Sequence, residues 1–193
     1  MYDLPTFVTI DEKDYNVRNK ADYRTILGVI AACEDVELTP EERVLTSLII
    51  FYEDIDSIDS VFETFQTSEK IEDAIDQMMQ FIGCYNDDIG YKTQYKVIDW
   101  VQDEQLIVSA INNVARTEIR ALEYLHWWTF IGYYMAIGES PLATIVGIRD
   151  KIAKHKKLED FEKEFKRENP QYFRWKSDEV QAQNILEQIW NKE

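Results

Sequence analysis

The order of hydrophobic and polar residues predicts a short β-hairpin followed by helices along most of the chain. Residues 7–17 alternate hydrophobic and polar side chains on both sides of a charged turn, as two antiparallel strands do. From residue 21 onwards, hydrophobic residues recur every three or four positions, which is the spacing of a buried helix face. The predicted helices span residues 21–32, 38–55, 68–83, 99–116, 116–138, 140–157, 158–170 and 177–191.

Two of these helices begin at recognisable capping signals. Thr39 precedes Pro40 and is followed at the third helical position by Glu42, which is the pattern of a capping box. Asp99 precedes the hydrophobic run of the next long helix, and Gln102 stands where its capping partner would be. We therefore expect one helix to start directly after Thr39 and another directly after Asp99.

The elements predict one all-α domain, residues 1–193, with a small N-terminal β-hairpin. The polar stretch 84–96 has no periodicity, so it is either a loop within one bundle or the division between two sub-bundles. Residues 156–193 are expected to form a charged C-terminal helical extension. Only 6 Gly and 4 Pro occur, which disfavours β-sandwiches and barrels because these folds need many tight turns.

Acidic residues dominate the chain and exclude some classes of partner. The formal net charge is −16, which opposes binding to nucleic acids and to anionic membrane surfaces. The charge is uneven, because residues 1–148 carry −17, residues 149–176 carry +4 and residues 177–193 carry −3. This asymmetry favours electrostatic selection of a partner and allows a homo-oligomer. The alternative is that these charges are only solvated helix faces.

The residues that usually carry catalysis or bind metals are sparse or badly spaced. The sequence has two histidines, and it lacks the HExxH, GxSxG, P-loop and GxGxxG motifs. Residues 53–60 hold four acids, but the ligand spacing of an EF-hand loop is missing, so they are interpreted as a solvated helix end. Cys33 and Cys84 show no CxxC spacing and fit free thiols. We expect no enzymatic activity, no cofactor and no metal site.

No leader or membrane span is recognised in the sequence. The start of the chain lacks the pattern of a signal peptide, and no uncharged hydrophobic run reaches the ~18 residues that cross a bilayer. The sequence therefore predicts an intracellular, soluble protein.

The richest aromatic stretch, "LHWWTFIGYYMAI" at residues 125–137, decides between two interpretations. Consecutive helical residues are ~100° apart, so the two tryptophans point in different directions and the helix is hydrophobic nearly all round. It is either a central core helix or a helix whose exposed rings receive a partner. His126 is expected to donate a hydrogen bond to Asp99 or Asp103. Interface candidates are Trp127, Trp128, Tyr133 and Tyr134, with Ile189 and Trp190 from the last predicted helix.

Several segments in a fixed order carry a resemblance to a phage protein family. They are "LPTFVTIDEKDYNV" near the start, "LTPEERV" at 38–44, "IDWVQDEQLIVSAI" at 98–111, "LHWWTF" at 125–130 and "TIVGIRDKI" at 144–152. The chain resembles the family typified by gene product fifteen of a Listeria temperate phage, which occurs in long-tailed phages and prophages of Gram-positive bacteria. The sequence departs from the family pattern at residues 112–124.

The resemblance implies a function in building phage tails. The family's genes usually lie between those of the major tail protein and the tape measure protein, where tail assembly chaperones are encoded. By this resemblance the chain would bind both proteins in the host cytoplasm, keep the tape measure protein soluble and be missing from mature virions. Two alternatives remain, namely a structural adaptor that stays in the particle and an acidic mimic of DNA.

Overall fold

The computed structural model describes residues 3–86 and 95–175, which form helices preceded by one β-hairpin. The predicted fold class is confirmed. The predicted helix 177–191, with Ile189 and Trp190, lies outside the described residues. In chain order, the elements are β1 (Phe7–Ile10), β2 (Lys13–Asn16), η1 (Arg18–Ala21), α1 (Tyr23–Glu34), α2 (Pro40–Phe51), α3 (Ile58–Phe65), α4 (Ser68–Ile82), α5 (Glu104–Ala115), η2 (Ile119–Ala121), α6 (Trp127–Met135), α7 (Pro141–Ala153), α8 (Asp160–Glu168) and η3 (Pro170–Phe173).

The hairpin lies where the alternation predicts it. Strands β1 and β2 pair antiparallel, and Asp11 and Glu12 between them both have positive φ, 49° and 62°. Left-handed backbone at both central residues is the mark of the two-residue turn that suits the twist of a hairpin. The inward residues of β1, Val8 and Ile10, are buried, and this strand packs against α4.

Helix α2 begins at the predicted capping box. The hydroxyl of Thr39 accepts the N–H of Glu42 at 3.3 Å, and the Glu42 carboxylate accepts the N–H of Thr39 at 2.8 Å. At the other end, Arg18 donates hydrogen bonds to the carbonyl oxygens of Ile49 and Tyr52. Both ends of α2 therefore have partners for backbone groups that the helix itself leaves free.

The predicted helix 38–55 ends earlier than expected, and the four acids of residues 53–60 are exposed from its end to the first turn of the next helix. Helix α2 stops at its C-cap, Tyr52, whose extended backbone forms a β-bridge with Val17. A separate helix, α3, then starts behind Ser57, whose hydroxyl accepts the N–H of Ser60. The break comes from a contact with a segment 35 positions earlier, which local periodicity cannot indicate.

The helix expected directly after Asp99 starts later. The Asp99 carboxylate does cap a turn, because it accepts the N–H groups of Val101 and Gln102, but α5 begins only at Glu104. The expected partner is also wrong. The N–H of Asp99 donates to the Asp103 carboxylate, while the Gln102 side chain donates to the Arg174 carbonyl.

The predicted helix 116–138 is helical only from Trp127 onwards, apart from the single turn η2. The extended residues before α6 lie against the start of α1. The N–H of Tyr23 donates to the Leu125 carbonyl at 2.9 Å, and the N–H of Leu125 donates to the Asp22 carboxylate at 3.0 Å. The Arg24 side chain binds the Leu122 carbonyl at 2.7 Å. These long-range bonds use the backbone groups that a helix would need.

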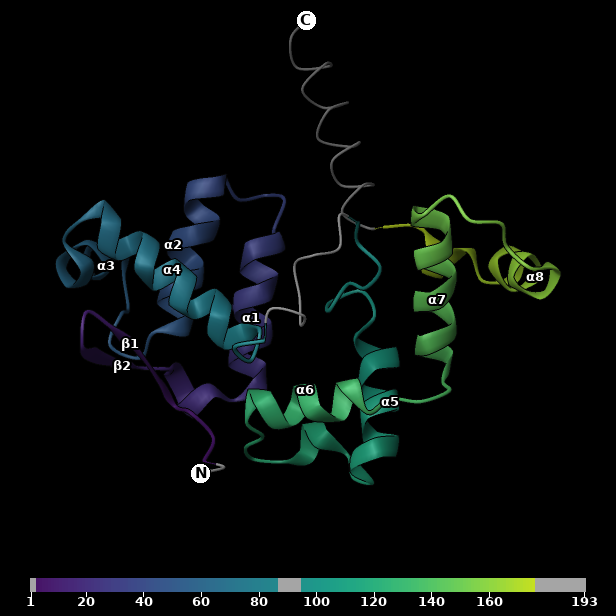
Figure 1. Cartoon of the computed structure of the whole chain (residues 1–193), viewed down its shortest axis with the longest axis horizontal. Helices are drawn as coiled ribbons and strands as arrows, with labels where there is room; N and C mark the ends of the chain where they lie inside the picture. The colour runs from purple at the N-terminus through teal and green to yellow at the C-terminus, as the bar shows by residue number, and fades with distance from the viewer. Residues whose placement is uncertain (1–2, 87–94, 176–193) are drawn as a thin grey trace, which may run out of the picture.

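Figure 1 shows the hairpin and α1–α4 on one side of the molecule, with α5, α7 and α8 on the other and α6 beneath the gap between them. Helix α6 packs against both α1 and α5. One continuous cluster of buried hydrophobic residues includes members from both sides. A division into two sub-bundles at residues 84–96 stays a prediction. Within residues 3–86 and 95–175, no helix has the length and hydrophobicity needed to span a bilayer.

Candidate protein-binding site

The tryptophan pair attaches α6 to the end of α4. The indole N–H of Trp127 donates to the Ile82 carbonyl at 2.9 Å, and that of Trp128 donates to the Phe81 carbonyl at 3.1 Å. The last carbonyl groups of a helix lack the N–H partners of its interior, so the end of α4 can accept both indole N–H groups, although the Phe81 carbonyl also accepts the N–H of Cys84 at 3.0 Å. Trp127 is 1% exposed and Trp128 is half-buried. The core interpretation therefore fits Trp127.

His126 is the N-cap residue of α6, and its ring also contacts Pro5 in the segment before β1, which we call the N-terminal arm. Its Nδ1 accepts the N–H of Trp128 at 3.0 Å, and its Nε2 lies 2.8 Å from the carbonyl oxygen of Pro5. A carbonyl only accepts, so Nε2 carries the proton and the ring is neutral. The prediction of a carboxylate partner is wrong, because a backbone carbonyl occupies that position. Burial lowers the pKa of His126.

A buried ion pair connects α5 and α7. Arg149 donates to both carboxylate oxygens of Asp103, at 2.5 and 2.9 Å, and the two side chains are 4% and 0% exposed. Two further N–H groups of Arg149 donate to the carbonyls of Val97 and Tyr172, at 3.2 and 2.8 Å. A buried charge is tolerated when it is paired and hydrogen-bonded, and each nitrogen of this guanidinium donates at least one hydrogen bond.

Trp100, three positions before Asp103, lies against the aromatic helix α6. Its ring centroid lies 6.0 Å from that of Trp127, 6.2 Å from Phe130 and 5.1 Å from Tyr134. The D-W-x-Q-D motif thus meets both of the others. Its Trp100 lies against Trp127 of HWW, and its Asp103 pairs with Arg149 of IR. We call these four residues the central contact region. The sequence indicated the motifs, but it could not show that Asp103 and Arg149 pair across 46 positions.

A hydrophobic cleft of about 320 Å³ opens beside the central contact region. Its walls are α1 and α5, and Trp100 and Phe130 also line it. Val101, on its edge, is 68% exposed, although most large hydrophobic residues nearby are buried. The hydrophobic lining is Tyr23, Leu27, Trp100, Val101, Ile107, Val108 and Phe130, and the charged lining is Arg24, Glu104 and Arg120.

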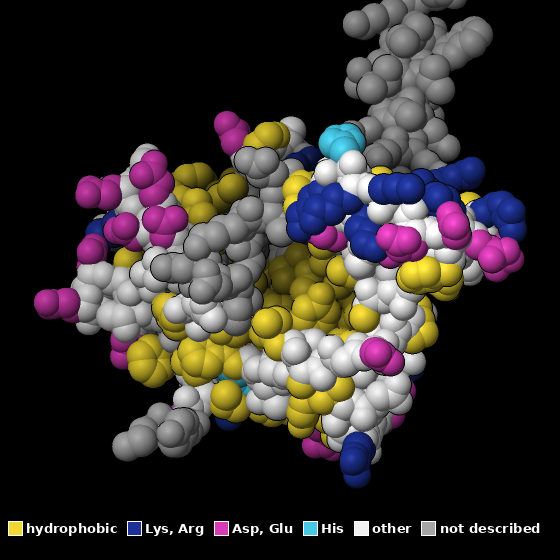
Figure 2. All heavy atoms as spheres, turned by 45° about the vertical axis from the view of Figure 1, so that its right-hand side comes forward, with side chains coloured by type: hydrophobic (Ala, Val, Ile, Leu, Met, Phe, Trp, Pro, Cys, Tyr) yellow, Lys and Arg dark blue, Asp and Glu magenta, His cyan; other side chains and the backbone are white. Residues whose placement is uncertain are grey.

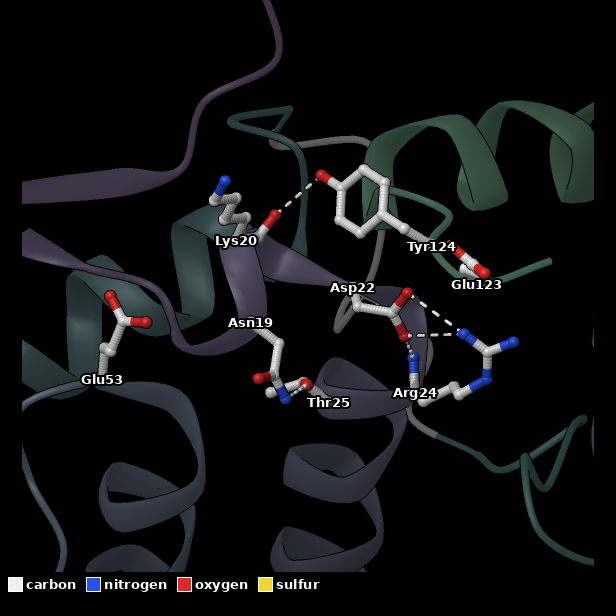
Figure 3. Close-up of a pocket in the computed structure, with 8 residues that line it drawn as sticks. All are labelled: Asn19, Lys20, Asp22, Arg24, Thr25, Glu53, Glu123 and Tyr124. Carbon is white, nitrogen blue, oxygen red and sulfur yellow. Dashed lines mark hydrogen bonds and ion pairs between the residues drawn. The ribbon is translucent and has the colours of Figure 1, made fainter.

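A second cleft, of about 540 Å³, lies at the start of α1 and is polar (Figure 3). Its polar groups mostly bind one another. Asp22 pairs with Arg24 at 3.2 Å, and the Tyr124 hydroxyl donates to the Lys20 carbonyl at 2.9 Å. Figure 3 shows the Glu53 side chain apart from these pairs. The polar groups of this cleft therefore serve to hold the start of α1 against residues 122–126. The hydrophobic cleft is the better candidate for binding a partner.

The described side chains offer little for catalysis. In residues 3–86 and 95–175, no three His, Cys, Asp or Glu side chains come together as a metal site would require. Burial raises the pKa of the Cys84 thiol to about 11, so at neutral pH it is protonated and a poor nucleophile. The hydrophobic cleft is suited to packing against a side chain of another protein.

The interface candidates from the sequence differ in how deeply they are buried. Tyr133 and Tyr134 are half-buried near the end of α6, Trp127 is in the core, and Ile189 and Trp190 lie outside the described residues. A role of these residues in binding stays a prediction. Sequence reasoning missed the cleft because its walls come from α1 and α5, which are about 80 residues apart in the chain.

Comparison with known families identifies the class of protein. A family model described as "Bacteriophage Gp15 protein" matches residues 1–173. The chain therefore belongs to this family of phage proteins, as the resemblance implied. It is a structural phage protein family that is not known for enzymatic activity. Neither the comparison with curated proteins nor the comparison with solved structures found a match.

Proposed function

We propose that this protein is a tail assembly chaperone of a long-tailed phage. It holds the tape measure protein soluble in the cytoplasm of a Gram-positive host, recruits major tail protein subunits, and is absent from the mature virion. The observation that carries the proposal is membership of the phage family over residues 1–173. Family membership supports a function in phage structure or morphogenesis, and the surface of the protein favours the chaperone among such functions.

A chaperone for a long helical protein has to bind hydrophobic side chains while staying dispersed itself. The hydrophobic cleft offers a lined space for one or two such side chains, with Val101 exposed at its edge. Arg24 and Arg120 around it already pair with Asp22 and Glu118, so the Glu104 carboxylate is the lining charge that can meet a positive charge of a partner. An amphipathic helix has this combination of surfaces. The net charge of −16 keeps the loaded complex from aggregating.

Co-expression with the tape measure gene of the same phage tests the proposal. We expect the tape measure protein to remain soluble and to copurify with this chain, and to precipitate without it. Val101→Asp places a charge at the exposed edge of the cleft, so it should abolish copurification without unfolding the protein. Met135→Asp is the matched control, because Met135 is 63% exposed at the end of α6 and does not line the cleft.

A structural adaptor is the second candidate, and the structural character of the family favours it. Mass spectrometry of purified virions separates the two functions. A chaperone should be missing from mature particles, whereas an adaptor should be present in a fixed copy number. A tape measure protein that is equally soluble with and without this chain would contradict the chaperone proposal.

A further inference from the structure

Helix α3 has a hydrophobic face that the rest of the described structure covers only in part. Val61 and Phe65 point inwards and are 0% exposed, whereas Ile58 and Phe62, one turn apart, are 50% and 51% exposed. On a helix these four residues form one continuous stripe. Half of the stripe belongs to the core, and the other half is free to pack against another protein.

This free stripe lies in the most acidic part of the chain. Residues 53–76 hold nine Asp and Glu and a single Lys, Lys70, which pairs with Asp11 at 3.2 Å. In the described parts of the chain, none of these nine carboxylates has an ion-pair partner. Acidic side chains cover that end of the molecule in Figure 2. We call Ile58 and Phe62, with the carboxylates around them, the acidic face.

The opposite end of the molecule combines an exposed aromatic residue with lysines. Phe161 of α8 is 65% exposed, and residues 151–157 contain four Lys and no acid. Lys156 and Lys157 have no ion-pair partner in the ranges that the structure describes. Figure 2 shows Lys and Arg side chains gathered at this end. We call Phe161, Lys156 and Lys157 the basic face.

The acids of α8 do not cancel the basic face. Asp160 pairs with Lys163 at 2.7 Å, Glu164 pairs with Arg167 at 3.2 Å, and the buried Glu162 pairs with Lys151 at 2.6 Å. Each of these carboxylates is thus neutralised within α8 or by α7. Among the described residues of this end, the groups without an ion-pair partner include Lys156, Lys157 and Lys166 and the carboxylates of Glu159 and Glu168, so a positive charge remains.

We propose that copies of this chain associate head to tail, with the acidic face of one copy on the basic face of the next. Ile58 and Phe62 pack against Phe161, and the carboxylates meet Lys156 and Lys157. Figure 1 places α3 and α8 at opposite ends, so the two faces cannot meet within one molecule. A contact between two different faces leaves one of each unused, and therefore it can extend into a row of subunits.

Analytical ultracentrifugation of the full chain alone tests this proposal independently of any tape measure protein. At about 0.05 M salt the average mass should rise with protein concentration, and at about 0.5 M salt it should fall back towards the monomer, because salt screens exposed charges. A wild-type chain that stays monomeric at every concentration in low salt would overturn the proposal.

Two single-face variants show which surfaces meet. Phe62→Ser disables the acidic face and Phe161→Ser disables the basic face, so each variant alone should associate about tenfold more weakly or not at all. Mixed, the two variants should form a dimer that does not grow, since each retains the face that the other lacks. Met135→Ser is the control at a distant exposed residue and should associate like the wild type.

The results that contradict head-to-tail association are equally definite. If either variant alone still associates like the wild type, the contact uses other surfaces. If the mixture stays monomeric, the two faces do not bind each other. All three side chains are largely exposed, so the variants should fold, and circular dichroism verifies this. Lys156→Glu with Lys157→Glu should also abolish association, and a double variant that associates like the wild type would contradict the pairing of the lysines with the acidic face.

Discussion

Helices α2 and α6 both begin at a capped residue, but the caps depend on different kinds of information. The cap of α2 is local, because Thr39 and Glu42 satisfy each other's backbone groups within four positions. The cap of α6 is also made by its own residue, His126, yet that ring needs the Pro5 carbonyl to hold it in place. The residues before α6 are extended because they bind the start of α1.

The difference teaches why one helix follows its sequence pattern and the other does not. A capping box favours a helix start in any surroundings, whereas the start of α6 exists only when α1, α4 and the N-terminal arm are in place. Changes in the central contact region should therefore disturb the whole fold, and changes at the cap of α2 should have a small and local effect.

The largest effect is expected from Trp127→Ala. The change removes a buried ring and also the indole N–H that donates to the Ile82 carbonyl. The free energy of unfolding should therefore fall by about 4–5 kcal/mol. Chemical denaturation measures this difference. Trp128→Ala is the matched control, and because Trp128 is only half-buried its loss should be about half as large. Equal losses would contradict the different burial of the two rings.

Arg149→Met should cost about 3 kcal/mol, because it leaves the Asp103 carboxylate buried without its partner. Replacing both residues, Arg149→Met with Asp103→Leu, should restore much of the stability, since no buried charge remains. Thermal unfolding of the single and double variants compares the two. A double variant less stable than the single one would show that Asp103 stabilises the fold mainly by accepting the N–H of Asp99.

A smaller effect is expected at the locally determined helix start. Thr39→Ala removes the hydroxyl that accepts the Glu42 N–H, and should lower the free energy of unfolding by about 1 kcal/mol. Thr39→Ser keeps the hydroxyl and should retain most of the stability. Hydrogen exchange should report faster opening in the first turn of α2 alone. Faster exchange in α6 as well would contradict the local character of this cap.

The smallest expected effect on the free energy of unfolding comes from the titration of His126, and it is confined to a limited pH range. Burial lowers its pKa in the folded protein below the value of about 6.5 in the unfolded chain, so the unfolded chain takes up a proton first. The contribution of this neutral ring is complete above about pH 6.5 and is lost as the pH falls below that value.

Denaturation at a series of pH values tests this contribution. His126→Asn, which does not titrate, should lack this part of the pH dependence and retain the part due to carboxylates at lower pH. If the wild type and the variant depend on pH in the same way between about pH 5 and 7, the ring does not titrate as its burial implies.

The sequence by itself determined the fold class, the hairpin and the start of α2, because these depend on periodicity and on groups a few positions apart. It also indicated the motifs of the central contact region and the family to which the chain belongs. Only the tertiary structure decided that Asp103 pairs with Arg149, that residues 122–126 are extended, and that α1 and α5 enclose a cleft. Hydrogen bonds and burial between segments far apart in the chain produce these features, and they override the local preference for helix.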